Sequence, residues 1–431
     1  MKLNFRERGK QTKGITLIAL VITIIILLIL AGISIAALTN QGLFEKAKEA
    51  KQKTEDAQKN ESQTLENYLE QMNSIAFSNV NKKETNPEGA MPKDAIVIEG
   101  DANKGIVIKD IKDNEWTWVE VPMSITADKT TDNDIENALI AYAKDYREGI
   151  KGQGCDWSDE WYAMDGDTLI TAKTANLSTE QKALKNGCGL SYDEYYAAKH
   201  NMLQCIKNNG GFWISRYEIG DSTATVNRTS DSNKTEGAVS KPNQIPFNFV
   251  TCSQAQTLSS GMSTDSSKTS SLLFGIQWDL TCKFLETKSN LEQKNINEDS
   301  KNWGNYKDNG FKLNRGKYIT SPYISDSVWV EFNVDTENYV IDSKKLELLE
   351  GKNDRVLITT GASETTNKMN IYDLAANVWE LTLELANNSA PCAIRGGGYG
   401  DNGTTAVSCR SCLTTTRINN ISNVGFRASL Y

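Results

Sequence analysis

The longest hydrophobic run of the chain lies near its N-terminus. Residues 15–38 contain 24 positions without a charged side chain, most of them Ile, Leu, Val or Ala. As a helix, this run is apolar on every side and ~36 Å long, enough to cross a hydrocarbon layer of ~30 Å. It therefore predicts a transmembrane helix over 15–38. The basic residues before it predict a cytoplasmic leader over 1–14 and an exported remainder: Lys2, Arg6, Arg8, Lys10 and Lys13.

A polar helical pattern follows the hydrophobic run. Residues 39–75 are rich in Ala, Lys, Glu and Gln, which favour helices, so we predict a helical stalk there. The stalk either packs on neighbouring proteins or is a solvated, charged helix. Residues 76–94 are polar and contain Pro87 and Pro92, and this pattern predicts a linker.

Within residues 95–431, some short hydrophobic segments have the two-residue repeat of a strand and others have the 3.6-residue repeat of a helix. Polar insertions occupy about 123–208 and 287–302. The alternating segments predict strands at 95–98, 106–108, 116–121 and 212–219, of which 116–121 has the pattern of a half-buried strand. Helical patterns occupy 132–147, 191–208, 251–258 and 271–286. Strands and helices do not alternate regularly, so the predicted fold class is α+β.

Composition narrows the function. The 431-residue chain is 39% hydrophobic with a net charge of −8, and this acidic balance argues against a nucleic-acid partner. A single histidine, His200, excludes His-rich metal sites. His200 lies in a polar helical pattern, where we expect a partly exposed side chain without a catalytic role.

The junction between the leader and the hydrophobic run has a recognisable motif. Lys13-Gly14-Ile15, followed by the long apolar helix, resembles the cleavage and methylation motif of type IV prepilins and pseudopilins. The resemblance implies cleavage between Gly14 and Ile15 by a prepilin peptidase. Most pilins carry Glu at the fifth mature position, where this chain has Ala19, so filament assembly is expected to be weak or to depend on other pilins. A secretory signal peptide is the competing interpretation.

Motifs in the C-terminal part resemble the formylglycine-generating enzyme family, whose fold is a variant of the C-type lectin fold. They occur in the family order: Gly210–Glu218, Lys241–Asn243, Leu273–Asp279, Asn370–Leu381, Arg395–Tyr399 and Gly425–Arg427. The resemblance implies a C-type-lectin-like domain over 95–431.

Several of these motif residues have the chemistry of a structural frame. Glycines after Arg395 allow backbones to approach closely, and Trp379 and Phe426 suit a small core. Arg395 and Arg427 are expected to pair with Glu380 or Asp373. The full predicted frame is Trp379, Glu380, Arg395, Gly396, Gly397, Arg410, Gly425, Phe426 and Arg427.

The oxidase activity of that family is not expected here. Asp401 and Ala406 stand where the family has its copper-binding cysteine pair, and Cys409 and Cys412 come later. Positions three apart on a strand point to opposite faces, which separates these two sulfurs. The eight cysteines permit disulfides in an exported protein, but their spacing predicts no pairing. We therefore predict no enzymatic activity, with an exported oxidase as a distant alternative.

The remaining interpretation is ligand binding. The segment 399–423 is rich in Gly, Asn, Thr and Ser, a composition typical of polar recognition loops, although an ordinary polar loop would look the same. It also resembles the variable region of target proteins of diversity-generating retroelements, which often end in a lectin-like fold. Candidate ligand-binding residues are Tyr399, Asp401, Asn402, Thr404, Thr405, Ser408, Cys409, Ser411, Cys412, Leu413, Arg417 and Ile418.

These features together predict a single-pass protein of the bacterial cell membrane with an extracellular head. The head would be an adhesin or receptor for a protein or glycan on another surface, and the alternative is a structural minor pilin associated with a pilus. Calcium is a further expectation, because lectin-like folds hold it with loop oxygens. The nearest candidate ligands are Asn367, Asn370 and Asp373. No other cofactor is expected.

Overall fold

The computed structural model describes most of the chain. The described residues are 17–40, 43–77, 81, 84–147, 157–225, 234–309, 311–320, 328–332, 340–341, 355–386, 392–413 and 422–431. They form two compact units, Met1–Gln71 and Met72–Tyr431. The predicted leader over 1–14 and the predicted cleavage site between Gly14 and Ile15 lie outside the described residues, as do Arg417 and Ile418.

The first unit is helical. Helix α1 spans Leu17–Asn40, and helix α2 spans Leu43–Ala76 and ends in the second unit. The described side chains of α1, residues 20–33, are all exposed and uncharged. Among the described residues, no helix meets both the length and the apolar character that a membrane crossing requires. The predicted stalk helix agrees with the extent of α2.

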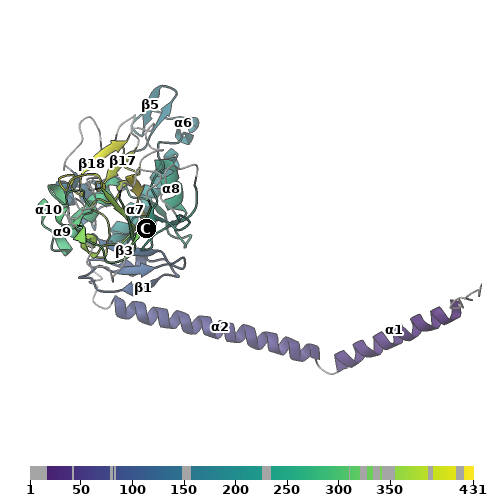
Figure 1. The fold of residues 1–431 in the computed structure, drawn as a ribbon. Helices are drawn as coiled ribbons and strands as arrows, with labels where there is room; N and C mark the ends of the chain where they lie inside the picture. Colours follow the sequence, from purple (N-terminus) through teal and green to yellow (C-terminus); the bar gives the residue numbers. More distant parts are fainter. Residues whose placement is uncertain are drawn as a thin grey trace, which may run out of the picture. The chain divides into compact units, whose positions relative to one another are not determined.

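The second unit, which we call the head, is α+β, as predicted. Its centre is a six-stranded antiparallel sheet in the order β1-β2-β3-β6-β20-β10. Figure 1 labels two of its strands, β1 and β3. The strands are β1 (Ile96–Glu99), β2 (Val107–Lys109), β3 (Glu115–Glu120), β6 (Gly211–Ser215), β10 (Ser270–Leu272) and β20 (Ala428–Leu430). Strand β20 therefore returns from the far C-terminal region to the interior of the sheet.

The central strands are buried on both faces, so the prediction of a half-buried strand at 116–121 is wrong. Trp116, Thr117, Trp118 and Val119 are all buried. Helices α7 (Tyr192–Asn209) and α9 (Gly275–Lys288) pack against β6 and β3, and the Thr117 hydroxyl donates to a carbonyl of another layer. The alternating sequence pattern did not reveal burial on both faces, because a Trp side chain can be covered by the layer on either side of the sheet.

Local signals explain the helices. Ser191 and Glu194 form a capping box at the start of α7, and Gly210 ends it with φ of 68°. Thr251 and Gln254 form the same box for α8 (Cys252–Ser260). The predicted helix over 132–147 is divided into α4 (Asp132–Tyr142) and α5 (Lys144–Arg147). The remaining helices are α3 (Pro87–Ala90), α6 (Thr179–Ala183) and α10 (Gln293–Asn297), with 3-10 turns at Met123–Ile125, Lys301–Trp303 and Glu364–Thr366.

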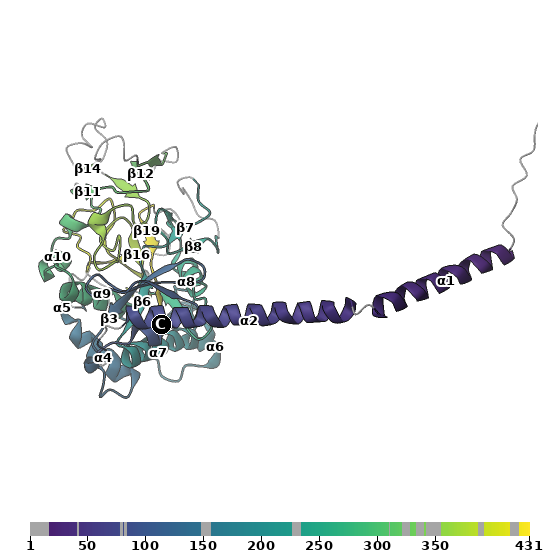
Figure 2. The same ribbon diagram turned by 90° about the horizontal axis from the view of Figure 1, so that it is seen from below.

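Smaller sheets complete the head. A four-stranded sheet has the order β18-β17-β16-β19, formed by Arg410–Leu413, Cys392–Arg395, Trp379–Leu381 and Val424–Phe426. The others are β13-β12-β15 (Val330–Glu331, Lys317–Thr320, Val356–Ile358), β8-β7-β9 (Ala238–Val239, Gly220–Asp221, Ile245–Pro246), β11-β14 (Phe311–Lys312, Val340–Ile341) and β4-β5 (Tyr162–Asp165, Thr168–Thr171). Strands β11, β12 and β14 lie across the central sheet from α4 and α7 (Figure 2).

The segment predicted as a linker is instead packed into the head. Thr85, Pro87, Ala90 and Pro92 are buried. The Thr85 hydroxyl donates to the Gly210 carbonyl at 3.1 Å, and it accepts from the Trp118 indole at 2.9 Å. The prolines that indicated a linker fit these contacts because their rings cover apolar surface without needing a backbone donor.

Candidate functional site

Most of the candidate ligand-binding residues lie on the segment between β17 and β18, and Ser411, Cys412 and Leu413 lie on β18 itself. These two strands pair in antiparallel register, with Arg395 opposite Arg410, and lie side by side in Figure 1. Residues 396–409 therefore leave the sheet and return to it at the same point. Both ends of the segment are fixed by one strand pair.

Buried charges hold the base of this segment. Arg395 and Arg410 have fully buried side chains, and both contact Asp279 and Glu384. Arg395 Nη2 lies 2.7 Å from Asp279 Oδ1, and its Nη1 lies 3.1 Å from Glu384 Oε2. Arg410 reaches the same carboxylates at 2.6 and 2.9 Å. Charge-assisted hydrogen bonds of this kind are stronger than hydrogen bonds between neutral groups.

A third arginine completes the buried network. Arg147 contacts Asp159, Asp279 and Glu384 at 3.1–3.3 Å, so the network has three arginines and three carboxylates. Asp159 also accepts from the first backbone amides of α9, Gly275 N and Ile276 N. Burial alone raises the pKa of Glu384, but Arg410, Arg395 and Arg147 outweigh it and lower that pKa to about 2. The Glu384 carboxylate is therefore ionised at neutral pH, between three arginines.

The prediction for the partners of Arg395 is wrong, whereas the prediction for Arg427 is confirmed. Arg427 forms a forked pair with Glu380, at 2.8 to 3.1 Å, inside the core. It also donates to the Ser215 carbonyl at 2.7 Å. Arg395 instead pairs with Asp279, 116 residues earlier, and with Glu384, 11 residues earlier. Phe426 is fully buried and Trp379 is 8% exposed, as expected of core residues.

Glycines let the segment pack closely, as predicted for Gly396 and Gly397. Their φ angles are 93° and 81°, which favour glycine, and a Cβ at either would lie 2.8 Å from a backbone carbonyl oxygen. Gly425 is also tightly enclosed, because a Cβ there would lie 2.9 Å from Val378 Cγ2. Gly403, which was not predicted as frame, abuts the Lys301 backbone in the same way.

Two of the candidate ligand-binding residues lie inside the protein. Tyr399 is 3% exposed and Ser408 is 1% exposed, so the expectation that they contribute to an outer surface is wrong. The Tyr399 hydroxyl is 2.6 Å from Ser422 Oγ, and its ring packs with Leu357 and Val378. The sequence did not predict the burial of Tyr399, because a tyrosine within a polar segment can lie either in a core or at a surface.

Asp401 is partly exposed and has a structural role. Its Oδ2 atom accepts from the Trp379 indole at 2.8 Å and from Gly398 N at 3.0 Å. Nearby backbone bonds fix the rest of the segment: Gly403 O accepts from Ser300 N, and Asp401 O accepts from Lys307 N.

A set of polar side chains remains at the surface of this fixed segment. Asn402, Thr404 and Cys412 are exposed, and Asp401, Thr405, Cys409 and Ser411 are partly exposed. The side chain of Leu413 lies outside the described residues. We call these seven residues the exposed set.

The calcium candidates are engaged by protein groups. Asp373 is fully buried and accepts from Gly361 N at 2.6 Å and from Thr366 Oγ1 at 2.7 Å. Asn370 accepts from Arg216 and donates to the Gly105 carbonyl. Asn367 donates to Glu364. These bonds account for Asn370 and Asp373 as connections within the frame, and calcium binding stays a prediction.

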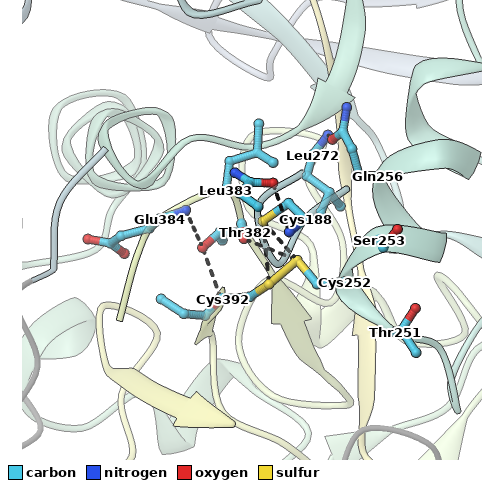
Figure 3. The surroundings of a disulfide bond; sticks show 12 residues. Cys188, Thr251, Cys252, Ser253, Gln256, Leu272, Thr382, Leu383, Glu384 and Cys392 are labelled. Carbon is cyan, nitrogen blue, oxygen red and sulfur yellow. Dashed lines mark hydrogen bonds between the residues drawn. A yellow bond between two sulfur atoms is a disulfide. The ribbon is translucent and has the colours of Figure 1, made fainter. Parts of the chain in front are cut away.

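The cysteines contain one feature that the sequence did not predict. Cys252 and Cys392 form a disulfide, and the Cys188 sulfur lies 3.2 and 3.4 Å from their two sulfurs (Figure 3). All three are buried. Burial raises the pKa of the Cys188 thiol to about 12, so it is protonated at neutral pH. Sequence spacing carried no signal, because the three residues come from segments far apart in the chain.

Two other sequence predictions concern chemistry. His200 is exposed on α7, with its Nδ1 2.7 Å from Asp132 Oδ2, as expected of a surface histidine on a helix. Asp401 accepts from the Trp379 indole and Ala406 is buried; these are the two residues that the sequence comparison set against a copper-binding cysteine pair. No protein-family model and no curated protein matches the chain.

Proposed function

We propose that this is a membrane-anchored display protein whose head binds a ligand through the exposed set, which lies on β18 and on the segment that joins it to β17. One observation carries the proposal. The backbone of this segment is fixed by buried ion pairs, crowded glycines and hydrogen bonds, yet its outward side chains are polar and have few partners within the segment. Recognition residues are commonly carried on loops that a rigid scaffold positions.

Rigidity matters for the energetics of such a site. A segment that is already ordered loses little conformational freedom when a ligand binds, so more of the contact energy appears as affinity. Short polar side chains such as Asn402 and Thr404 then provide hydrogen bonds whose geometry is set by the backbone. The expected ligand is a polar surface, either protein or glycan.

The same division into frame and surface fits a diversified protein. Substitution at Asn402, Thr404 or Cys412 would leave the buried Arg395 and Arg410 network untouched. We propose a C-type-lectin-like head of the kind found in targets of diversity-generating retroelements. The support is the resemblance of its motifs, together with the return of β20 to the central sheet beside β6.

The anchor is proposed from the sequence. Residues 15–38 carry no charge, the described side chains of α1 are exposed, and basic residues precede the run. Exposed apolar helices need lipid or a partner to cover them. A prepilin-like helix with Ala19 in place of Glu supports anchorage better than filament growth, so immunogold labelling should find no abundant homopolymeric fibres.

We also propose that the head does not oxidise cysteine peptides. Asp401 and Ala406 provide no thiol at the positions of the family's copper pair. Copper-dependent turnover of a sulfatase-type peptide by the purified chain would refute this part of the proposal.

The binding site is tested with two matched pairs of substitutions. Asn402→Ala with Thr404→Ala alters the exposed set, and Asn103→Ala with Thr168→Ala alters exposed residues of the same types elsewhere. Fluorescently labelled head, residues 72–431, is applied to bacterial and host-cell surfaces, and bound protein is measured by flow cytometry. We expect the first pair to weaken binding about 5- to 30-fold, from the loss of one or two hydrogen bonds.

The control pair should bind as the unaltered head does, and both variants should keep its melting temperature. Equal binding by all three proteins would place recognition outside the exposed set. Absence of binding to any surface would favour the structural minor pilin instead.

A further inference from the structure

Three buried sulfur atoms meet at one point of the head. Cys188 lies in the turn before α7, Cys252 is the first residue of α8, and Cys392 is the first residue of β17. Among the described residues, they are the one group of three or more potential metal-ligating side chains whose ligand atoms lie within 4.8 Å of one another. Figure 3 shows the Cys188 side chain directed at the Cys252–Cys392 bond.

The position of Cys188 is unsuited to thiol–disulfide exchange. Its sulfur is almost equidistant from the two bonded sulfurs, at 3.2 and 3.4 Å, so it lies beside the disulfide and not on the extension of its axis. Exchange proceeds by attack of a thiolate on one sulfur while the other leaves along the axis of the bond, and Cys188 does not lie on that axis. Its distances are also shorter than the ~3.5–4.0 Å at which even carbon atoms pack best.

A triangle of sulfurs is instead the arrangement that a three-coordinate soft cation requires. We propose that Cys188, Cys252 and Cys392, when all three are reduced, bind one Cu(I) ion as a trigonal thiolate site. With metal–sulfur bonds of ~2.3 Å, the ligand atoms would be about 4 Å apart. Cys188, at 3.2 and 3.4 Å from the other two sulfurs, is already close to this spacing, and the Cys252 and Cys392 sulfurs move apart when the disulfide opens. Thiolates are the ligands that select soft cations such as Cu(I).

The surroundings favour this cation over Zn²⁺. Structural zinc requires four ligands, and among the described residues these sulfurs contact, besides one another, the Thr382 carbonyl oxygen, 3.8 Å from Cys252 Sγ. The first turn of α8 begins at Cys252, and its backbone amides place positive potential beside the anionic sulfurs. None of the three cysteines belongs to the exposed set.

Cu(I) binding requires all three cysteines to be reduced, and it displaces their protons. In a newly made chain the three cysteines are thiols, and Cu(I) binding releases their protons to water. In the oxidised protein, a dithiol reductant must first supply two electrons and two protons to the Cys252–Cys392 bond, becoming a disulfide itself. Disulfide and metal are thus alternative cross-links between α8 and β17, and only the metal also attaches the segment of Cys188.

The test uses the full-length chain in detergent, with Cys409→Ser and Cys412→Ser to remove the surface Cys-x-x-Cys pair. The protein is reduced without oxygen and titrated with Cu(I) against a chromogenic Cu(I) chelator. We expect one equivalent to bind, three sulfur neighbours by X-ray absorption, and a raised melting temperature. Cys188→Ala should weaken binding by at least about 100-fold, beyond the loss typical of outer-shell changes.

Cys205→Ala is the matched control, because it removes another buried thiol outside the cluster and should leave Cu(I) binding unchanged. Alkylation with mass spectrometry provides a readout that does not depend on variants, since bound Cu(I) should protect Cys188, Cys252 and Cys392. Tight binding that survives Cys188→Ala, failure to compete with the chelator, or protection of Cys155 in place of Cys188 would each overturn the proposal.

Discussion

Glu384 and Asp279 each contact three arginines inside the head, and this sharing makes every member costly to remove. Arg410→Ala would leave two carboxylates undercompensated in the core, so we expect the free energy of unfolding to fall by about 3–5 kcal/mol. Urea denaturation of the head followed by tryptophan fluorescence measures this. Arg355→Ala removes an exposed arginine and should cost less than about 1 kcal/mol. Equal losses in the two variants would contradict a structural role for the network.

The same network predicts how stability depends on acidity. Glu384 has a pKa of about 2 in the folded head, against ~4.3 when unfolded, so its stabilising effect is complete above the unfolded value. As pH falls from ~4.3 through about 2, the folded state loses this contribution. Melting temperatures from pH 7 to pH 2 should therefore fall steeply at the acid end. Glu384→Gln should show a shallower decline, and identical slopes would exclude Glu384 as a source.

Residue types in the sequence predicted part of this arrangement. The pairing of Arg427 with Glu380 was predicted because a buried charge needs a partner. The close packing at Gly396 and Gly397 was predicted because glycines let backbones approach. The partners of Arg395 did not follow, because Asp279 lies 116 residues away and any acidic residue would have satisfied the same chemistry. Tyr399 was misplaced for a similar reason: its hydroxyl found Ser422, a neighbour made only by folding.

At the scale of elements, local signals were the reliable ones. Helix α7 was predicted almost to the residue because the capping box at its start and Gly210 at its end are local sequence signals. Strand β10 was missed and assigned to a helix, since its strand conformation depends on pairing with β20, about 158 residues later. The cluster of Cys188, Cys252 and Cys392 could not be predicted for the same reason, because folding brings its members together from distant segments.

Strand β20 should be indispensable to the head. It pairs with both β6 and β10, and its three residues are buried. Deleting residues 428–431 would expose two unpaired strand edges inside the sheet, so we expect the head to lose its cooperative thermal unfolding. Circular dichroism melts measure this. Deletion of residues 293–297, the short and partly exposed helix α10, serves as an element-sized comparison and should be less damaging, although Ile296 is buried.

At the scale of the whole molecule, the prepilin interpretation makes a simple prediction. Export through a prepilin pathway should remove Met1–Gly14 and leave Ile15 as a methylated N-terminus. Intact-mass analysis of protein extracted from membranes distinguishes the outcomes. A retained Met1, or cleavage near Ala37, would show that the leader is not processed as a prepilin.

The place of β20 in the sheet also sets the order in which the head can be made. Its Ala428 amide donates to Ser215, 213 residues earlier, so the central layer remains open until almost the whole head has left the ribosome. Contacts between such distant residues form slowly, because a large loop must close first. For the export that we propose, this delay would keep the head unfolded during translocation and let it close on the far side of the membrane.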